Sequence, residues 1–351
     1  MDTKKITKYC NDATVIENRS LSMVIISIGT VVFFLSLIAL CVGRYNIPIP
    51  QILDIIVSKI FNLNGSFDDV TYNVIINLRL PRVFAALLIG SALSLSGTTY
   101  QGIFKNPLVS PDILGVSSGA CVGASISILL KLGIWGIQLF AFLFGILTVI
   151  ITMLIPRIMK RDSTITLVLS GVIVSGFMSS ILGFLKYVAD PDTQLADITY
   201  WQLGSISKVT FDSLSKIAPI IIIVTIILLS LRWRINILSL GDNEAHSLGV
   251  NLKLERGLAV LCATILTASS VCLSGTIGWI GLIMPHLSRM LVGNNNVRCL
   301  PVAALMSAGF LLIIDTLSRT ISVGEIPLGI LTGLIGAPFF TWMLFKQRME
   351  N

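Results

Sequence analysis

Apolar stretches long enough to cross a membrane recur along this sequence. They lie at about 21–43, 83–100, 113–130, 137–156, 165–187, 217–231, 257–275, 276–292, 300–319 and 326–345. A helix rises about 1.5 Å per residue and the hydrocarbon core of a bilayer is about 30 Å thick, so stretches of this length match single spans. The pattern therefore predicts an all-α membrane protein with about ten transmembrane helices.

The longest uncharged stretch needs two helices rather than one. Residues 258–288 contain no Lys, Arg, Asp or Glu, whereas Arg256 precedes the stretch and Arg289 follows it. As one helix it would extend roughly 46 Å, well beyond the hydrocarbon core. Gly275 and Gly278 interrupt it near its middle. We therefore expect a helical hairpin that returns both arginines to one side of the membrane, the cytoplasm.

The composition supports this fold class. The 351 residues are 54% hydrophobic and only 12% charged, with a mean hydropathy of +0.89, whereas about a quarter of the residues in an average soluble domain are charged. The formal net charge of +7 would suggest a nucleic-acid partner in a soluble chain. Here we interpret it as the excess of Lys and Arg that fixes membrane topology, so no nucleic-acid partner is expected.

The charges also orient the predicted spans. With the amino terminus inside, ten crossings return the carboxyl terminus to the cytoplasm, and the inner segments then hold most of the 25 Lys and Arg residues. Residues 1–20 form a polar cytoplasmic extension, and residues 21–351 form the transmembrane domain. Long outer segments are expected at 44–78, with a helix around residues 52–60, and at 188–216.

The inner segment 232–256 carries a predicted short amphipathic helix. Residues 240–250 read LGDNEAHSLGV. Asp242 can cap the start of a helix, Glu244 complements its positive end, and Gly249 can end it in a left-handed conformation. We expect this helix to lie at the inner membrane surface.

A short motif recurs in two spans. Residues 95–98 and 273–276 both read LSGT, and Pro107 and Pro285 follow the two copies at the same distance. An odd number of predicted crossings separates the copies, so they run in opposite directions. The pattern is typical of the inverted repeats of transporters, with a chance match as the alternative.

The sequence lacks the residue patterns of an enzyme. Its two histidines, His246 and His286, lie on different segments, and it contains no HExxH motif and no Cys/His cluster with metal-ligand spacing. No P-loop of the form GxxxxGK[ST] occurs, so any ATP must be handled by a partner. We therefore expect no catalytic residues, no metal site and no cofactor bound by this chain.

Asp315 is the one well-embedded acid of the predicted spans. An ionised acid is costly inside a bilayer, so such a residue is by default a functional hypothesis. One interpretation is a proton or sodium site in an ion-coupled secondary transporter. The other, which the spacing favours, is a local ion pair with Arg319 four residues further along the same helix.

Seven groups of residues occur together in a recognisable order. They are 79–82 (RLPR), 101–102 (QG) with 106–108 (NPL), 114–119 (LGVSSG), 201–205 (WQLGS), 240–242 (LGD) with 247–250 (SLGV), 278–286 (GWIGLIMPH), and 327–329 (PLG) with 336–338 (GAP). In this number, order and spacing they resemble the FecCD family of ABC importer permeases, which carry ferric siderophores, haem or vitamin B12. The likeness runs from about Arg79 to the end of the chain.

The resemblance implies an inverted-repeat permease of the vitamin B12 and siderophore importer type. Such a subunit dimerises around a central translocation path, as a homodimer or with a paralogue. It binds two copies of a separate ATP-binding cassette ATPase inside and receives cargo from an extracytoplasmic substrate-binding protein. ATP and Mg would be bound by the ATPase, and the implied location is the cytoplasmic membrane of a prokaryote.

The resemblance also implies three sets of functional residues. Outward arginines that would grip carboxylates of the binding protein are Arg79, Arg82 and Arg319. The coupling element that would sit in a groove of the ATPase contains Leu240, Gly241, Asp242, Ala245, Ser247, Leu248 and Gly249. The residues that would narrow the path at its inner end are Asn106, Leu108, Ser163 and Thr164.

Together these observations predict the permease subunit of a binding-protein-dependent ABC importer for an iron chelate, with a ferric siderophore as the first candidate. Haem, cobalamin and molybdate stay open as cargoes, because selection would lie in the binding protein. The rival hypothesis is the ion-coupled secondary transporter that uses Asp315.

Overall fold

The computed structural model describes residues 21–43, 45–61, 68–160, 164–322 and 324–350, and within these ranges every regular element is a helix. Seven of the described helices are long and apolar enough to cross a membrane, and three shorter apolar helices accompany them. These helices coincide one by one with the ten predicted apolar stretches. The predicted fold class is therefore confirmed.

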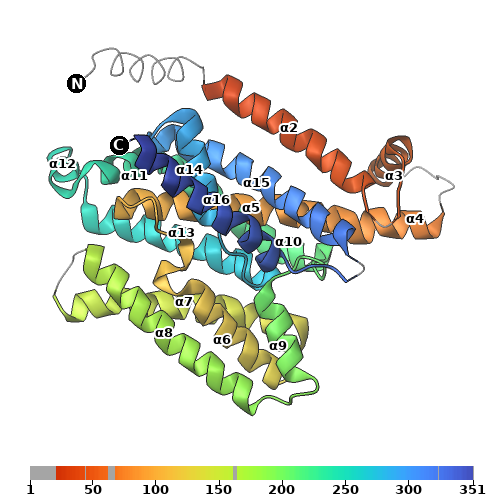
Figure 1. Ribbon diagram of the computed structural model, residues 1–351, viewed down its shortest axis with the longest axis horizontal. Coiled ribbons are helices and arrows are strands. Elements are labelled where there is room, and N and C mark those ends of the chain that lie inside the picture. Colours follow the sequence, from red (N-terminus) through yellow and green to blue (C-terminus); the bar gives the residue numbers. More distant parts are fainter. Residues whose placement is uncertain (1–20, 44, 62–67, 161–163, 323, 351) are drawn as a thin grey trace.

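The apolar helices run back and forth along the longest axis of the molecule (Figure 1). They are α2 (Leu21–Cys41), α5 (Leu80–Phe104), α6 (Val116–Leu129), α7 (Gly133–Ile158), α8 (Thr164–Val188), α10 (Phe211–Ser230), α13 (Leu252–Ser274), α14 (Ile280–Val292), α15 (Asn296–Ile321) and α16 (Leu328–Glu350). The shorter elements are α3 (Ile49–Phe61), α4 (Asp69–Asn73), the π-helical η1 (Val74–Arg79), the 3₁₀ helix η2 (Pro111–Leu114), α9 (Gln194–Leu203), α11 (Arg232–Leu240) and α12 (Asp242–Ser247).

The two ends of the molecule differ in the short helices they carry. The start of α2, the end of α16 and α12 lie at one end, which we call the α12 end, and α4 lies at the other, the α4 end (Figure 1). The chain thus begins and finishes its described crossings at the same end, as the even number of predicted spans requires.

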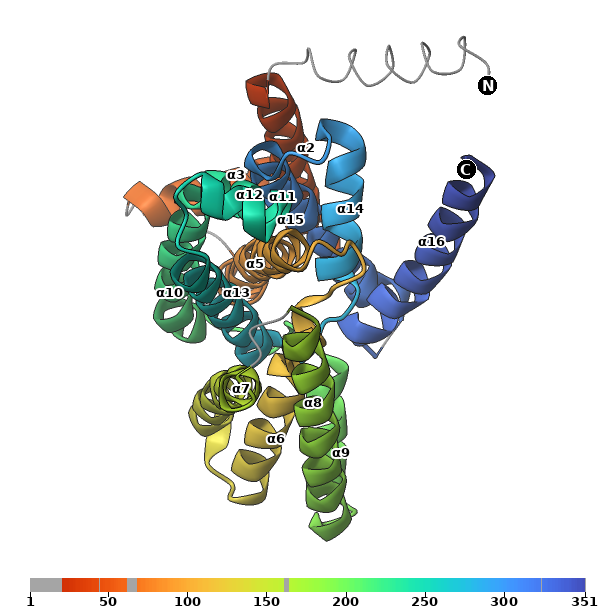
Figure 2. The ribbon, with the colours of Figure 1, turned by 90° about the vertical axis from the view of Figure 1, so that its left-hand side faces the viewer.

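Helix α5 forms the centre of the larger group of helices. It is surrounded by α10, α13, α14 and α15 (Figure 2), and nearly all of its side chains are buried. Its polar side chains find partners on α13: Ser96 Oγ donates to the carbonyl oxygen of Ala263 at 2.9 Å, and the Tyr100 hydroxyl lies 2.9 Å from Thr264 Oγ1. Such internal partners are needed because lipid offers none.

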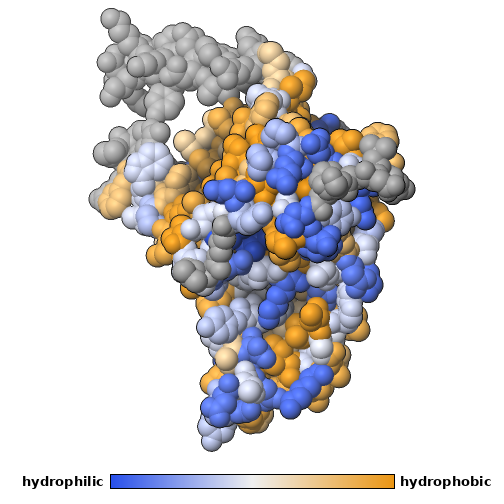
Figure 3. Space-filling model, turned by 90° about the vertical axis from the view of Figure 1, so that its right-hand side faces the viewer, coloured by the Kyte–Doolittle hydropathy of each residue, from blue (hydrophilic) through white to orange (hydrophobic). Residues whose placement is uncertain are grey.

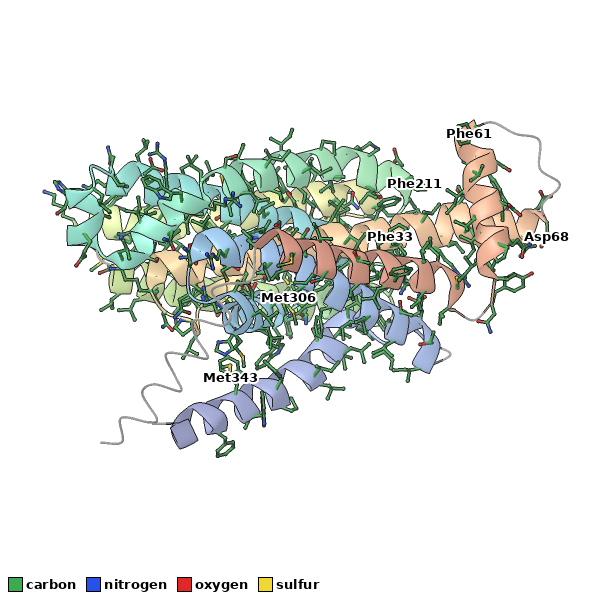
Figure 4. The ribbon with its side chains drawn as sticks, turned by 90° about the horizontal axis from the view of Figure 1, so that it is seen from above. Phe33, Phe61, Asp68, Phe211, Met306 and Met343 are labelled. Carbon is green, nitrogen blue, oxygen red and sulfur yellow. The ribbon has the colours of Figure 1, made fainter. Side chains whose placement is uncertain are left out.

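A second group, α6 to α9, lies beside the first (Figure 2). Helix α6 approaches α7 closely because Gly119 and Gly123 face the carbonyl oxygens of Phe144 and Phe140, where a Cβ would collide. Helix α16 leaves the bundle towards its carboxyl end, as the view from above shows (Figure 4).

The segment between the first two long apolar helices is shorter than the predicted outer segment 44–78. The helix of residues 49–61 confirms the one expected around 52–60. However, α4, η1 and α5 form one continuous apolar helix over Asp69–Phe104, which begins where the side chain of Asp68 accepts a hydrogen bond from the Thr71 N–H. The span expected from residue 83 therefore starts well before it. The other outer segment, 188–216, contains α9.

The uncharged stretch 258–288 reverses direction as predicted. Gly275 ends α13 with a φ of 67°, a left-handed value that suits glycine, and α14 begins after Trp279. Both arms pack against α5, which lies between them (Figure 2), and α14 also packs against α15. The reversal is thus a splayed pair around α5 rather than a hairpin packed on itself.

The two LSGT copies lie on antiparallel helices but differ in local structure. Residues 95–98 lie inside α5, whereas residues 273–276 span the end of α13. Gly97 faces the carbonyl group of Gly281 on α14, so a close helix crossing accounts for the first copy. The inverted repeat stays a prediction.

We predict that Gly97→Ala destabilises the protein by about 1–3 kcal/mol, because its Cβ would overlap a backbone carbonyl that cannot move without shifting α14. The measurement is the melting temperature of the purified protein in detergent. Gly29→Ala is the matched control, since a Cβ at Gly29 meets nothing within 4 Å. Equal melting temperatures for the two variants would contradict the close crossing of α5 and α14.

Candidate functional site

A cluster of charged side chains from η1, α5, α15 and the segment before α16 lies at the α4 end. Figure 3 looks onto this end and shows hydrophilic residues gathered over its middle. Arg82 Nε donates to Asp315 Oδ1 at 2.7 Å, and Arg82 Nη1 donates to Glu325 Oε1 at 2.8 Å. Arg319 Nε lies 3.8 Å from Asp315 Oδ2. Asp315, which has no exposed surface, is therefore shared by two arginines.

Two of the arginines fasten the end of α2. Arg79 Nη1 donates to the carbonyl oxygen of Leu40 at 2.5 Å, and Arg79 Nη2 donates to that of Tyr45. Arg319 Nη2 donates to the carbonyl oxygen of Ala39. The last carbonyls of a helix lack partners within the helix and carry its negative dipole end, so guanidinium groups suit this position. The cluster therefore joins α2 to α5 and α15.

The three predicted docking arginines are buried in this structure. Arg79, Arg82 and Arg319 expose only 5%, 8% and 7% of their surface. To bind carboxylates of another protein, these arginines would have to give up the hydrogen bonds that they now donate within this chain. Their docking role stays a prediction, and what the structure shows is a role in joining helices.

Asp315 has one partner that its sequence spacing predicts and a closer one that the spacing does not predict. The ion pair with Arg319 was expected from their spacing, but the closer partner is Arg82, which the chain order places far away. Glu325 was missed altogether, because an acid in a loop between two spans gives no signal of its partner. An acid held by two arginines favours the ion-pair interpretation of Asp315 over the proton relay.

Helices α11 and α12 replace the single helix predicted over 240–250. Helix α11 ends at Leu240, and α12 covers Asp242–Ser247. The residue that precedes α12 is Gly241 rather than Asp242, and the Glu244 carboxylate folds back over Gly241 into the space that a Cβ would take. Gly241 has an extended backbone conformation, so α11 ends before it and α12 begins after it. The left-handed Gly249, with a φ of 75°, is confirmed.

Residues 232–250, which contain α11 and α12 and which we call the α12 unit, combine a buried anchor with an exposed apolar surface. Ala245 is completely buried and Val250 nearly so, whereas Leu240 and Leu248 are each 59% exposed. Ser247 lies on the exposed side. Exposed leucines at the end of a membrane protein, beyond its spans, are typical of a surface that another protein covers.

The α12 unit is fixed to two spanning helices. Arg234 on α11 forms an ion pair with Glu255 on α13. Asn236 Oδ1 on α11 accepts from the Asn296 N–H at the start of α15, at 2.9 Å. Both α13 and α15 run from here to the α4 end (Figure 1). A displacement of α12 would therefore reach the far end of the molecule through rigid helices.

Of the four predicted gate residues, Asn106 and Leu108 can be described in full, and both lie at the α12 end. Asn106 Oδ1 accepts from the Leu108 N–H at 2.9 Å in the turn after α5, and Leu108 is 52% exposed. Ser163 lies outside the described residues. Thr164 is the first residue of α8, and its side chain is not described. The gate stays a prediction.

Comparison with known proteins shows what this chain is similar to. The model of the FecCD transport family matches residues 30–346. The chain is 40% identical over 313 residues to the molybdate import system permease protein MolB of Haemophilus influenzae, which covers 89% of this chain and 92% of that protein. It is 38% identical over 295 residues to the hemin transport system permease protein HmuU of Yersinia pestis, over 82% of this chain and 88% of that protein.

A solved structure gives the same result for the fold. An inward-facing conformation of a metal-chelate type ABC transporter matches with a TM-score of 0.84 at 37% sequence identity, over 93% of this chain and 99% of that one. The expected family resemblance is confirmed by these comparisons.

We predict that Asp315→Asn destabilises the protein by about 3–5 kcal/mol, because it leaves the buried Arg82 and Arg319 without their shared counter-charge. The double variant Arg82→Met with Asp315→Leu should recover part of the loss, since apolar groups can replace a buried ion pair. Thermal unfolding in detergent measures both.

The control is Asp212→Asn, which removes an exposed ion pair with Lys216 and should leave the melting temperature unchanged. If Asp315→Asn were as stable as the control, the cluster would not hold α5 and α15 together.

Proposed function

The chain belongs to the FecCD transport family, and from this premise we propose that it is the transmembrane permease subunit of a binding-protein-dependent ABC importer. In this proposal it provides the passage and a partner ATPase provides the energy. The sequence contains no P-loop of its own, which supports a separate ATPase. Two permease copies, two ATPase copies and one extracytoplasmic binding protein would form the working assembly.

The observation that carries the proposal is the exposed α12 unit. Exposed Leu240 ends α11 and exposed Leu248 follows α12, which is anchored through Ala245. Helix α11 is joined to α13 by one ion pair and to α15 by one hydrogen bond. A surface of this kind suits a groove in the ATPase, with Gly241, Asp242, Ser247 and Gly249 completing it. The α12 end would then face the cytoplasm, with both chain termini, in a prokaryotic cytoplasmic membrane.

The second permease copy would complete the translocation path. Helix α16 leaves the bundle and carries exposed apolar side chains, Leu334 at 67% and Phe345 at 62%. Similarity to an inward-facing transporter supports a conformation that is open at the α12 end. Asn106, Leu108, Ser163 and Thr164 would narrow the path there, on the segments that follow α5 and begin α8.

The binding protein would dock at the opposite, α4 end. We propose that Arg79, Arg82 and Arg319 take part by passing from their internal acceptors to carboxylates of the binding protein. Arg82 is the best placed of the three, because its partner Glu325 is half-buried at the surface. The others hold α2 and would have to release it.

The proposed cargo is a metal-containing compound, with an iron chelate as the first to test. One relative is named for hemin and another for molybdate, so the cargo varies among close relatives of similar identity. Haem, cobalamin and molybdate are therefore the alternatives within the same architecture. We do not propose ion coupling through Asp315, since its two arginine partners account for its burial.

We predict that Leu248→Asp abolishes co-purification of the ATPase and reduces transport to background, because a charge would replace an exposed apolar side chain directly after α12. The measurement is pull-down of the ATPase with the tagged permease. Leu53→Asp is the matched control, since Leu53 is a 47% exposed leucine on a short helix at the opposite end. Normal co-purification of Leu248→Asp would remove α12 from the coupling role.

We predict that proteoliposomes holding the permease, its ATPase and the loaded binding protein accumulate cargo only with ATP inside the vesicles. Ferric siderophore, haem, cobalamin and molybdate are tested in turn. An ionophore that collapses ion gradients should leave uptake unchanged. Accumulation without ATP that the ionophore abolishes would instead establish the secondary transporter.

A further inference from the structure

The segment between α5 and α6 carries an acid that has no role in the proposed function so far. After α5 the chain turns back from the α12 end into the bundle and forms η2, in which Asp112 is exposed (Figure 1). Both ends of η2 are anchored. Pro111 fills the place that a Cβ at Gly281 would take, and the carbonyl oxygen of Leu114 accepts from Thr152 Oγ1 at 3.1 Å. Asp112 is thus an exposed side chain on a fixed piece of backbone.

This acid lies at the depth of the hydrocarbon core. The backbone of η2 contacts α7 at Thr152 and α8 at Gly171, where the carbonyl oxygen of Ile113 takes the place of a Cβ. Both contacts lie about 10 Å from the α12 ends of these helices, at a rise of about 1.5 Å per residue. Helices of 26 and 25 residues exceed a core of about 30 Å by only about 4 Å at each end. Helix η2 therefore lies within the membrane rather than at its inner surface.

The carboxylate of Asp112 has no basic partner among the residues that the structure describes. Its Oδ1 accepts from Ser117 Oγ in the first turn of α6, and no ion pair joins it to a described Lys or Arg. The amino-terminal end of α6 is the positive end of its dipole, so a negative charge is favourable beside it. The acid is thus held in place by α6 but is not neutralised by a cation of the described chain.

The exposed side of Asp112 cannot face lipid. A carboxylate in contact with hydrocarbon is strongly unfavourable, and acids within the membrane usually face the protein interior or a water-filled passage. Helix η2 lies between the two groups of helices (Figure 2): α5 and α14 pack on one side of it, and α7 and α8 pack on the other. An exposed acid between two helix groups, at this depth, is what the wall of an aqueous passage requires.

We propose that Asp112 lines the water-filled translocation path and gives the part near the α12 end a negative charge, so that the path favours a neutral or cationic metal chelate over a divalent oxyanion such as molybdate. The physical reason is that a fixed charge beside low-dielectric walls acts strongly on a passing ion. The cargo preference rests on the proposed function, whereas the access of water to Asp112 can be measured on the permease alone.

The first test is the reaction of introduced cysteines with charged reagents in lipid nanodiscs. Asp112→Cys and Ser117→Cys are treated with the cationic trimethylammonioethyl or the anionic sulfonatoethyl methanethiosulfonate. Modified peptides are mapped by mass spectrometry, so the native cysteines can stay. We expect both reagents to modify both positions. Ile150→Cys is the matched control, since Ile150 is a 48% exposed residue of α7 at similar depth, and it should react with neither reagent.

The second test measures the sign of the local charge. At Ser117→Cys the cationic reagent should react about tenfold faster than the anionic one, after correction by the same ratio for free cysteine. This preference should fall to about onefold when Asp112→Asn is added, because the substitution removes the charge and keeps the size. Asp190→Asn, which changes an exposed acid of the α8–α9 segment, is the control and should leave the preference unchanged.

Each outcome bears on a separate part of the proposal. If neither reagent modified Asp112→Cys or Ser117→Cys in variants that elute as the wild type does, the passage beside η2 would be excluded. An unchanged reagent preference in Asp112→Asn would exclude the negative charge. In the proteoliposome assay, accumulation of molybdate in preference to a ferric trihydroxamate would overturn the cargo preference, whereas the absence of all ATP-driven uptake would count against the proposed function alone.

Discussion

The rest of this structure depends on one constraint: lipid offers no hydrogen-bond partners, so the backbone polar groups of a spanning chain, and the polar side chains near them, take their partners from the protein. Helix α5 shows how the chain meets it. Most of its residues are buried, and the hydroxyls of Ser96, Thr98, Thr99 and Tyr100 bond to its own carbonyls or to α13. Where α5 crosses α14, glycines bring the two backbones into direct contact. The other helices of the larger group take their positions from this central one.

The same constraint explains the charges at the α4 end. Five ionisable side chains lie close together there, and three of them are arginines that point back into the protein rather than out of it. They bind two acids and the last carbonyls of α2, so a helix that is otherwise weakly buried is held by its end. Of the three arginines, only Arg82 pairs with an acid that is partly exposed, Glu325, whereas Arg79 and Arg319 hold the end of α2.

The two ends of the molecule are joined through α13 and α15. At the α12 end these helices hold α11 through Arg234–Glu255 and through the Asn236 side chain. At the α4 end, α15 carries Asp315 and Arg319, and α13 ends at Ser274. A displacement of α12 would therefore reach the charged cluster at the α4 end through two continuous helices. This geometry gives a physical route between events on opposite sides of a membrane.

The amino-acid sequence by itself determined the class of the protein, its apolar helices, the reversal near Gly275 and the left-handed end at Gly249. These features follow from composition and local backbone preference, which a stretch of residues carries with it. The sequence also contained the motifs that identify the family. It missed the early start of the long helix at Asp69, because polar residues at a helix end resemble those of a loop.

The tertiary structure alone decided which residues meet. Arg82 and Asp315 lie on different helices and far apart in the chain, and Glu325 gave no local signal of its partner. The predicted docking arginines lie together at the α4 end, and their burial could not be read from the chain. Periodicity reports which face of a helix is apolar, whereas pairing between helices depends on distances that only the packed fold sets.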